Sequence, residues 1–493
     1  MRQTHSLQLR VGQTPIEKIQ LDLHSRDDMT KILLGLQFIY GQIEIRERVF
    51  SYLEKMLPGK TDPNNGRPGM QLWNILVLGV VRLGKNIDFD CLTDLANQHN
   101  ALRMMLGHEG YFDQDYRYAL QTVIDNLKWF TPEILSGINQ IIVEAGHVFA
   151  RIDHKPLESK CDSYVAKTNV HYPTDINLLW DAVRCLIRNC SQAADEFNIP
   201  GWRQVDYQQK RIKNLYRGAQ NSKRSKAKNP EKVKVREQAI QDAHQAYMDR
   251  CQPFLERADL LVSNLSNEPM ALFYIEKIQS FKAHMRRQMD QIERRVIKGE
   301  VIPHAEKVFS IFQGHTEWIC KGKAGVPMEL GLRVAIMTDQ LGFILHHQVM
   351  PQQTDDQVAV SMVTETQKKF PRLVQTSFDK GFYSVNNLQK LQHHLDLVVM
   401  PKKGKLSKAD AAREKSPEFV KARRKHSAVE SSINALEHSG LDKCRDHGIE
   451  GFKRYVALGV LARNIKILGA MIQRKKQEEE KNKKESPLQL LAA

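Results

Sequence analysis

The chain has 493 residues, 41% of them hydrophobic and 26% charged, which excludes a single compact core and predicts a soluble protein of two to four domains. Its net charge of +16 favours a polyanionic partner, nucleic acid above all. Seven scattered cysteines, with no second pair to match Cys185 and Cys190, indicate neither a zinc site nor a disulfide framework and fit a reducing cytosol. The polar N-terminus predicts no signal peptide. The apolar window over 455–472 contains Arg463 and Lys466, so we expect a buried helix there and no membrane partner.

The first 150 residues are predicted to form an all-helical domain. A loop rich in glycine and proline over 59–69 interrupts it. Three apolar stretches predict its longer helices: 29–40, 49–57 and 70–83. Two shorter helices, 89–97 and 101–106, are joined by a polar turn. Such a pair is either a helix-turn-helix unit that reads DNA or part of a plain helical bundle, and we expect residues 1–150 to bind DNA ends.

A predicted strand over 157–165 carries Asp162 in its interior. An aspartate in the middle of a strand is costly to bury without a partner, so Asp162 is either a metal ligand or a surface-facing residue. Asp153 competes for the ligand role but lies outside the apolar strand, and we prefer Asp162. Asp175 is expected to cap a helix over 176–188.

Residues 183–300 carry almost no strand signal and predict a helical insertion. A basic stretch over 222–236 lies within it. Two long apolar patterns at helical spacing predict a packed hairpin: Ile240, Ala243, Tyr247, Phe254 and Leu261, then Ile278, Phe281, Met285, Met289, Ile292 and Val296. The polar face of the second pattern is basic: Lys282, Arg286, Arg287, Arg294 and Arg295. That face is either solvated or in contact with a phosphate backbone.

Strand signals return after the insertion in three segments: 316–320, 329–337 and 343–349. The last two flank a short turn and predict a β-hairpin, in which we interpret Asp339 as a turn former. A helix over 357–369 follows. Asp355 and Asp356 stand at its start and are interpreted as N-terminal caps.

The next stretch places two carboxylates where metal-ion chemistry can use them. A strand over 373–378 delivers Asp379 at its C-terminal end, and Gly381 allows a sharp backbone turn. A helix over 386–394, a strand over 395–400 and a basic linker come next. On a final helix over 427–436, Glu430 lies beside a core-facing stripe formed by Val429, Ile433 and Leu436. A strand-end Asp and a helix Glu at one edge of a mixed α/β sheet predict a divalent-metal site.

Several phrases occur together in this order. They are the strand aspartate Asp162, the phrase His171-Tyr172-Pro173-Thr174-Asp175, the phrase Phe378-Asp379-Lys380-Gly381-Phe382-Tyr383, and Val429-Glu430. In the first domain, Gly66-Arg67-Pro68-Gly69 precedes an apolar helix, and Ala101-Leu102-Arg103 with Leu106-Gly107 follows it. As a set they resemble the DDE transposases of bacterial insertion sequences. The resemblance covers roughly residues 60–182 and 315–470.

The resemblance implies an α/β fold of the ribonuclease-H-like type, a mixed sheet flanked by helices. It divides the chain into a helical N-terminal domain, a catalytic domain in two pieces, a helical insertion and a charged, disordered tail: 1–150, 151–182 with 301–475, 183–300 and 476–493. The matching catalytic triad is Asp162, Asp379 and Glu430. Many relatives place Tyr, Arg and Lys around the Glu where this chain has Arg423, His426 and Glu437, so it resembles a neighbouring subgroup.

The triad suits phosphodiester chemistry. Two Mg²⁺ ions, or Mn²⁺ in their place, can activate a nucleophile and support the leaving oxygen, and both metals prefer the oxygen ligands that Asp162, Asp379 and Glu430 would supply. Basic residues near the site are expected to contact DNA phosphates or simply to keep a loop soluble: Lys380, Lys402, Lys403, Lys405, Arg423 and Arg424. His426 either approaches a phosphate or is a satisfied helix residue.

We therefore expect a bacterial, cytoplasmic, nucleoid-associated transposase. It would bind the terminal inverted repeats of its element and join the cut ends to target DNA, with double-stranded DNA as its partner and a homodimer in the synaptic complex. Two alternatives stay open. One is a catalytically silent DNA-binding protein derived from a transposase. The other is a helical scaffold that binds RNA through its basic insertion.

Overall fold

The computed structural model describes seven stretches of the chain: 3–5, 8–57, 69–109, 115–224, 229–266, 268–320 and 328–490, the last without side chains beyond residue 483. The chain forms two compact units. Unit 1 comprises Met1–Asn169 and Glu317–Ala493, and unit 2 comprises Val170–Thr316. Most of the predicted loop over 59–69, with its Gly66-Arg67-Pro68 motif, lies outside the described residues, and so does part of the basic stretch over 222–236.

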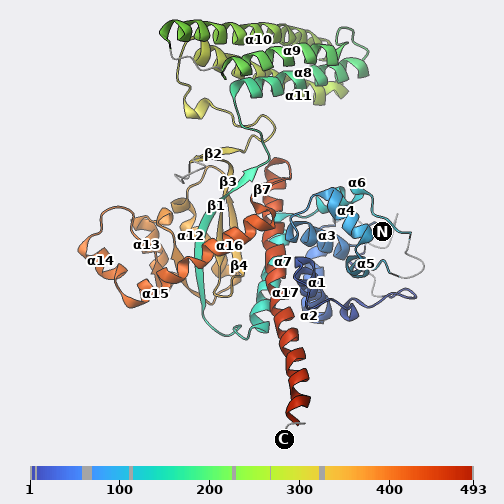
Figure 1. The fold of residues 1–493 in the computed structure, drawn as a ribbon, viewed down its shortest axis with the longest axis vertical. Helices are drawn as coiled ribbons and strands as arrows, with labels where there is room; N and C mark the ends of the chain where they lie inside the picture. The colour runs from blue at the N-terminus through green and yellow to red at the C-terminus, as the bar shows by residue number, and fades with distance from the viewer. Residues whose placement is uncertain are drawn as a thin grey trace. The chain divides into compact units, whose positions relative to one another are not determined.

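A mixed sheet of seven described strands organises unit 1 (Figure 1). The strands are β1 (Leu157–Thr168), β2 (Glu317–Cys320), β3 (Met328–Thr338), β4 (Ile344–Met350), β5 (Leu373–Phe378), β6 (Leu397–Val399) and β7 (Lys443–Cys444). Their order is β2-β3-β1-β5-β6, with β4 also paired to β3 and β7 to β1. Strand β1 is antiparallel to β3 and parallel to β5, and β5 is parallel to β6. The predicted α/β class, the hairpin and the strand over 373–378 are confirmed.

The helices predicted for unit 1 are also present, at shifted ends. The helices of this unit are α1 (Asp28–Gly41), α2 (Ile43–Glu54), α3 (Leu72–Gly84), α4 (Phe89–Gln98), α5 (Asn100–Met105), α6 (Leu120–Leu127), α7 (Pro132–Phe149), α12 (Asp355–Lys369), α13 (Val385–Gln392), α14 (Lys408–Glu414), α15 (Pro417–His426), α16 (Ala428–Leu436) and α17 (Gly448–Leu490). Between α4 and α5 stands His99 alone, whose side chain accepts a hydrogen bond from the Leu102 N–H. The predicted helix pair is therefore real.

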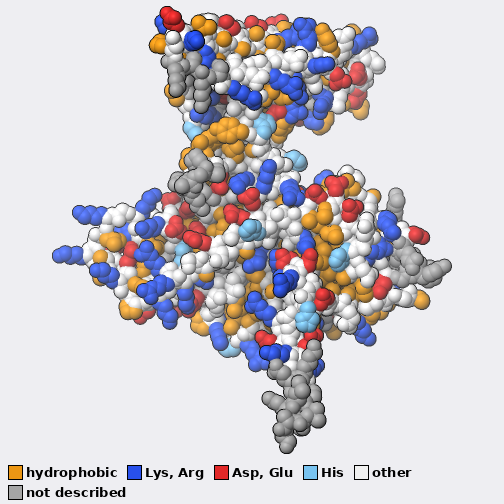
Figure 2. All heavy atoms as spheres, viewed as in Figure 1, with side chains coloured by type: hydrophobic (Ala, Val, Ile, Leu, Met, Phe, Trp, Pro, Cys, Tyr) orange, Lys and Arg blue, Asp and Glu red, His pale blue; other side chains and the backbone are white. Residues whose placement is uncertain are grey.

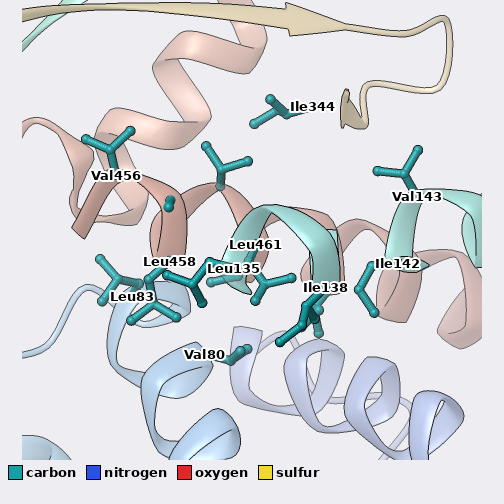
Figure 3. Close-up of a cluster of buried hydrophobic side chains, with 14 of the residues drawn as sticks. Val80, Leu83, Leu135, Ile138, Ile142, Val143, Ile344, Val456, Leu458 and Leu461 are labelled. Carbon is teal, nitrogen blue, oxygen red and sulfur yellow. The ribbon is translucent and has the colours of Figure 1, made fainter. Parts of the chain in front are cut away.

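Helix α17 joins the N-terminal helices to the sheet. It packs against α1, α3, α7 and β4, and one continuous core of buried side chains includes all of these elements (Figure 3). The approach of α1 to α17 is very close, because a Cβ at Gly469 would lie 1.7 Å from the Lys31 carbonyl oxygen. The helices of residues 1–150, predicted as an N-terminal domain, therefore share one core with the sheet, because α17 packs against both.

The predicted buried helix over 455–472 is confirmed within α17. By length and composition α17 could cross a membrane, but 72% of its most apolar window is buried in the protein. The predicted disordered tail is wrong for residues 476–490, because α17 continues through Leu490. Glu and Lys side chains three and four residues apart, such as Glu478 with Lys481 and Glu479 with Lys483, favour a helix there. The Gln477 side chain also donates to the Leu23 carbonyl oxygen at 2.5 Å.

Strand β4 carries two histidines whose burial predicts a loss of stability in acid. Burial lowers the pKa of His346 to about 3 and that of His347 to about 4. Because both values lie below the ordinary 6.5, the unfolded chain takes up these protons first as the pH falls. The contribution of the pair is fully present above about pH 6.5 and is lost progressively down to about pH 3. Urea unfolding at pH 7.5, 5.5 and 4.5 should show this decline.

Replacing both histidines with glutamine should flatten that pH dependence. The exposed His154→Gln variant is the matched control, since its side chain is 70% exposed and should behave like the wild type. Equal pH dependence in all three proteins would contradict the assignment.

Unit 2 is an all-helical bundle with a separate core. Its helices are α8 (Asp175–Glu196), α9 (Val205–Ser222), α10 (Pro230–Leu265) and α11 (Leu272–Ile292). The unit contains more of the chain than the predicted insertion over 183–300, and it includes the sequence from His171 to Asp175. Thr174, not Asp175, caps α8 by accepting from the Asn177 N–H. Helix α11 contacts α8 more extensively than α10, so the predicted hairpin is one part of a four-helix arrangement.

Candidate functional site

The register of two parallel strands sets Asp162 beside Asp379. Cys161 of β1 pairs with Phe378, the last residue of β5, so the next residue on each chain is one of the two aspartates. The Cys161 side chain is fully buried. Because side chains alternate along a strand, Asp162 points to the opposite face of the sheet. Two residues far apart in sequence thus meet at the carboxyl end of β5, as predicted.

Asp162 is surrounded by negative charge. Burial, helped by the charges of Asp379, Asp355 and Glu430, raises the pKa of Asp162 to about 7. The Ser163 N–H donates to Oδ1 at 2.7 Å and acts in the opposite direction. Asp379 directly follows β5, and Glu430 is in the first turn of α16. All three predicted ligands therefore belong to one electrostatic cluster.

Asp355 is a fourth carboxylate that the sequence did not assign to the site. It is the first residue of α12, and its Oδ1 accepts from the Ser163 hydroxyl at 2.7 Å. The predicted capping role is wrong, because the helix is preceded by Thr354, whose N–H donates to Gln357 Oε1 at 3.0 Å. Asp356 instead accepts from the Thr354 hydroxyl at 2.7 Å. Two adjacent aspartates at a helix start look alike in sequence, and only the hydrogen bond from Ser163 on β1 to Asp355 separates them.

Gly381 gives Asp355 the space it occupies. The sequence predicted a sharp turn that needs glycine, but Gly381 is not among the residues with positive φ. A Cβ at Gly381 would lie 2.8 Å from Asp355 Oδ2, which is closer than real Cβ contacts. The glycine therefore leaves room for the Asp355 carboxylate, and backbone strain does not explain it.

If the protein has the metal-dependent cleavage activity expected from its sequence, Gly381→Ala should reduce that activity by about tenfold or more, because Asp355 must move and small displacements of site groups are costly. The free energy of unfolding should fall by no more than about 1–3 kcal/mol, the usual cost of overpacking. Gly314→Ala is the control, since a Cβ at Gly314 would have nothing within 4 Å. Wild-type cleavage by the Gly381 variant would show that Asp355 has no part in the site.

His426 is close to two of the predicted ligands. Its Nδ1 and the Ser377 hydroxyl are 3.0 Å apart in a hydrogen bond. Its Nε2 is buried and has no hydrogen-bond partner among the described residues. Burial lowers the pKa of His426, while the charges of Asp379 and Glu430 act to raise it. His426 ends α15, so it lies on a separate helix from Glu430. Only one of its two ring nitrogens has a hydrogen-bond partner among the described residues.

Some of the predicted phosphate-binding residues have an acidic partner, and others have no ion pair among the described residues. Lys402 forms an ion pair with Asp410 at 2.5 Å, and Arg423 lies 3.9 Å from Glu414. Lys380, Lys403 and Arg424 are exposed. Figure 2 shows Lys and Arg side chains gathered over α14 and α15. From 402 to 425 the chain has ten Lys and Arg against three acidic residues, so this segment keeps a positive surface even after its internal pairs are formed.

Two other aspartates that competed for the ligand role, Asp153 and Asp339, lie away from the cluster around Asp162. Asp153 is 51% exposed and lies 3.6 Å from His154. Asp339 is buried in the turn between β3 and β4, where its Oδ1 accepts from the Leu341 and Phe343 N–H groups at 2.8 and 2.9 Å. The interpretation of Asp339 as a turn former is confirmed, and Asp162 is the aspartate that shares the cluster with Asp379.

The donor set suits a hard divalent cation. It consists of carboxylates, which Mg²⁺ prefers as ligands. Burial and the neighbouring negative charges disfavour the ionised carboxylate of Asp162, and a bound cation would stabilise that ionised form. As the side chains stand, no three His, Cys, Asp or Glu residues of the described stretches are gathered closely enough to hold a metal ion. The cluster therefore fits a metal by chemistry, with side chains that must draw together around it.

The arrangement can place divalent cations beside a basic surface at one edge of a sheet. Such an edge suits a polyanionic substrate, because the cation and the surrounding Lys and Arg side chains neutralise phosphate charge. Comparison of the chain with family models, curated proteins and solved structures finds no match.

Proposed function

We propose that the protein is a DDE-type transposase with a ribonuclease-H-like catalytic fold. The strand order supports the fold. Three antiparallel strands, β4, β3 and β1, are followed by β5 and β6, which run parallel to β1, and the helical unit 2 lies in the chain between β1 and β2. In this arrangement the first strand and the first parallel strand are neighbours, which is where the two aspartates stand.

The observation that carries the proposal is the cluster around Asp162. Its raised pKa comes from burial and from three other carboxylates, two of which, Asp379 and Glu430, match the transposase motif. Mg²⁺ or Mn²⁺ ions, two being expected, would be held by Asp162, Asp379 and Glu430 and would supply activation of a water or 3′-hydroxyl nucleophile and support of the leaving oxygen.

The chain's own residues prepare this edge for DNA. Ser163 fixes one oxygen of Asp355 and leaves the other facing Gly381, which makes Asp355 a positioning residue beside the ligands. Lys380 follows Asp379 directly and is exposed, so its ammonium can neutralise a phosphate next to the scissile bond. The exposed Lys403 and Arg424 can do the same farther along the backbone.

The biological setting belongs to the same proposal. The protein would bind the terminal inverted repeats of its element through residues 1–150, pair two ends in a homodimer, and transfer the cut strands to target DNA. It would work in the bacterial cytoplasm with nucleoid DNA.

A cleavage assay tests the proposal. Purified protein is incubated with a supercoiled plasmid that carries the DNA flanking its gene, with Mg²⁺, with Mn²⁺ or with EDTA. The expected result is cutting at the ends of the element that requires the metal. Binding of those ends without cutting under any metal condition would favour the catalytically silent alternative. Preference for RNA hairpins over duplex DNA would favour the RNA-binding scaffold.

A further inference from the structure

Ion pairs distinguish the two basic helices of unit 2. On α11, the helix that the sequence singled out, Lys282 and Arg286 both pair with Asp259. Just beyond α11, Arg294 pairs with Asp290, Glu300 and Glu306, and Arg295 pairs with Asp175 at 2.8 Å. The predicted phosphate-binding face of α11 is therefore largely neutralised within the unit.

The cations of α9 have no such partners. Lys210, Lys213 and Arg217 are exposed, and no salt bridge among the described residues involves them. They lie three and four residues apart, so they share one side of the helix. Ile212 and Ala219, seven residues apart, are fully buried on the other side. We call the outward surface formed by Lys210, Lys213, Asn214, Arg217 and Asn221 the α9 face.

The surrounding sequence strengthens the positive potential of the α9 face. From 197 to 230 the chain has nine Lys and Arg and a single acidic residue, Asp206. Arg203 and Arg211 are exposed close to it. Like charges in such a row repel one another, and the cost is relieved by a bound polyanion. Asn214 and Asn221 add neutral side-chain donors to the same side of the helix, and the ring of Tyr207 is 53% exposed at its start.

We infer that the α9 face binds the phosphate backbone of duplex DNA. The choice of duplex DNA as the polyanion rests on the proposed function, whereas the phosphate chemistry follows from the surface. From residue 210 to residue 221 the α9 face spans about 17 Å, which is about five base pairs of duplex. Lysine and arginine contacts to phosphate position DNA without reading its sequence. Unit 2 therefore adds affinity that is independent of the base sequence.

Salt-dependent binding of the full-length protein tests this inference. The triple variant Lys210→Gln, Lys213→Gln, Arg217→Gln is compared with a control, called the α11 triple, at three paired arginines on α11 and just beyond it: Arg286→Gln, Arg294→Gln, Arg295→Gln. The probe is a labelled 40-base-pair DNA duplex followed by fluorescence anisotropy over a KCl series. The α9 triple should lower the slope of log affinity against log salt by up to about 2.7 and weaken binding about tenfold or more in 100 mM KCl. The α11 triple should change the slope by much less.

Three results would overturn the inference. They are equal slopes for the two triples, an unchanged slope for the α9 triple, or tighter α9-dependent binding of double-stranded RNA of the same sequence. Matching thermal melts exclude unfolding as the cause of any loss. An Asp379→Asn protein should keep the full α9-dependent slope, so failure of the cleavage proposal and failure of this inference give different results.

Discussion

Asp379→Asn is expected to reduce metal-dependent cleavage of the element's ends by at least about a thousandfold, the scale on which single catalytic groups act. The substitution keeps the size of the side chain and removes the charge that a divalent ion would need. Asp379 is exposed at the end of β5, and its side chain makes no capping hydrogen bond, so the free energy of unfolding should change by less than about 1 kcal/mol. Single-turnover cleavage with purified protein and a supercoiled substrate measures the effect.

Asp153→Asn is the matched control for that experiment. It removes one carboxylate just before β1, where the side chain is exposed and near His154. Cleavage at the wild-type rate is expected from this variant. If the two variants cut equally well, Asp379 is not part of the active site.

Asp339→Ala, unlike Asp379→Asn, is expected to act mainly on stability, with a loss of about 3–5 kcal/mol in the free energy of unfolding. The carboxylate is buried and accepts hydrogen bonds from the Leu341 and Phe343 N–H groups, and its Oδ2 lies 2.7 Å from His147 Nε2. Its removal leaves buried donors unsatisfied and the β3–β4 turn unsupported. Urea unfolding followed by circular dichroism measures the change.

Asp442→Ala tests whether any lost carboxylate has this effect. Asp442 is 51% exposed and pairs with Lys167 at 2.6 Å, so its loss should cost less than about 1 kcal/mol. A small loss at Asp339, similar to that at Asp442, would contradict the structural role assigned to the buried aspartate.

Local patterns were sufficient to locate the strand ends of the candidate site. The apolar run before Asp379 matches β5 residue for residue, because a short hydrophobic segment followed by a polar turn has one reasonable interpretation. The helix of Glu430 was found for a similar reason, since Val429 and Leu436 are buried on its inner side. Pairing of β1 with β5 was not predicted, because the local pattern of neither strand shows which strands are its neighbours.

Asp355 escaped prediction because its role depends on a contact between distant segments. An aspartate at a helix start is ordinarily explained by capping, and nothing local distinguishes Asp355 from Asp356. Only the folded chain brings Asp355, at the start of α12, to the Ser163 hydroxyl on β1. Gly381 was noticed, but its reason was a neighbour in space and not its own backbone angles.

The core shared by the N-terminal helices and the sheet could not be predicted for a related reason. The N-terminal helices and the sheet each have their own sequence character, but α17 packs against both and unites their cores. In unit 2, composition pointed to the basic residues of α11, and the structure shows that acidic partners surround them. Charge pairing between helices cannot be read from the periodicity of one helix, so the unpaired cations of α9 were overlooked.

Metal binding is the most direct test of the claim that distant carboxylates form one site. Mn²⁺ is titrated into the full-length protein with a 40-base-pair duplex, and free Mn²⁺ is followed by electron paramagnetic resonance. We expect bound Mn²⁺ in the wild type and in Asp153→Asn, with strong loss in Asp162→Asn, Asp379→Asn and Glu430→Gln. Equal Mn²⁺ binding by the wild type and these three variants, or no binding by the wild type, would contradict the account.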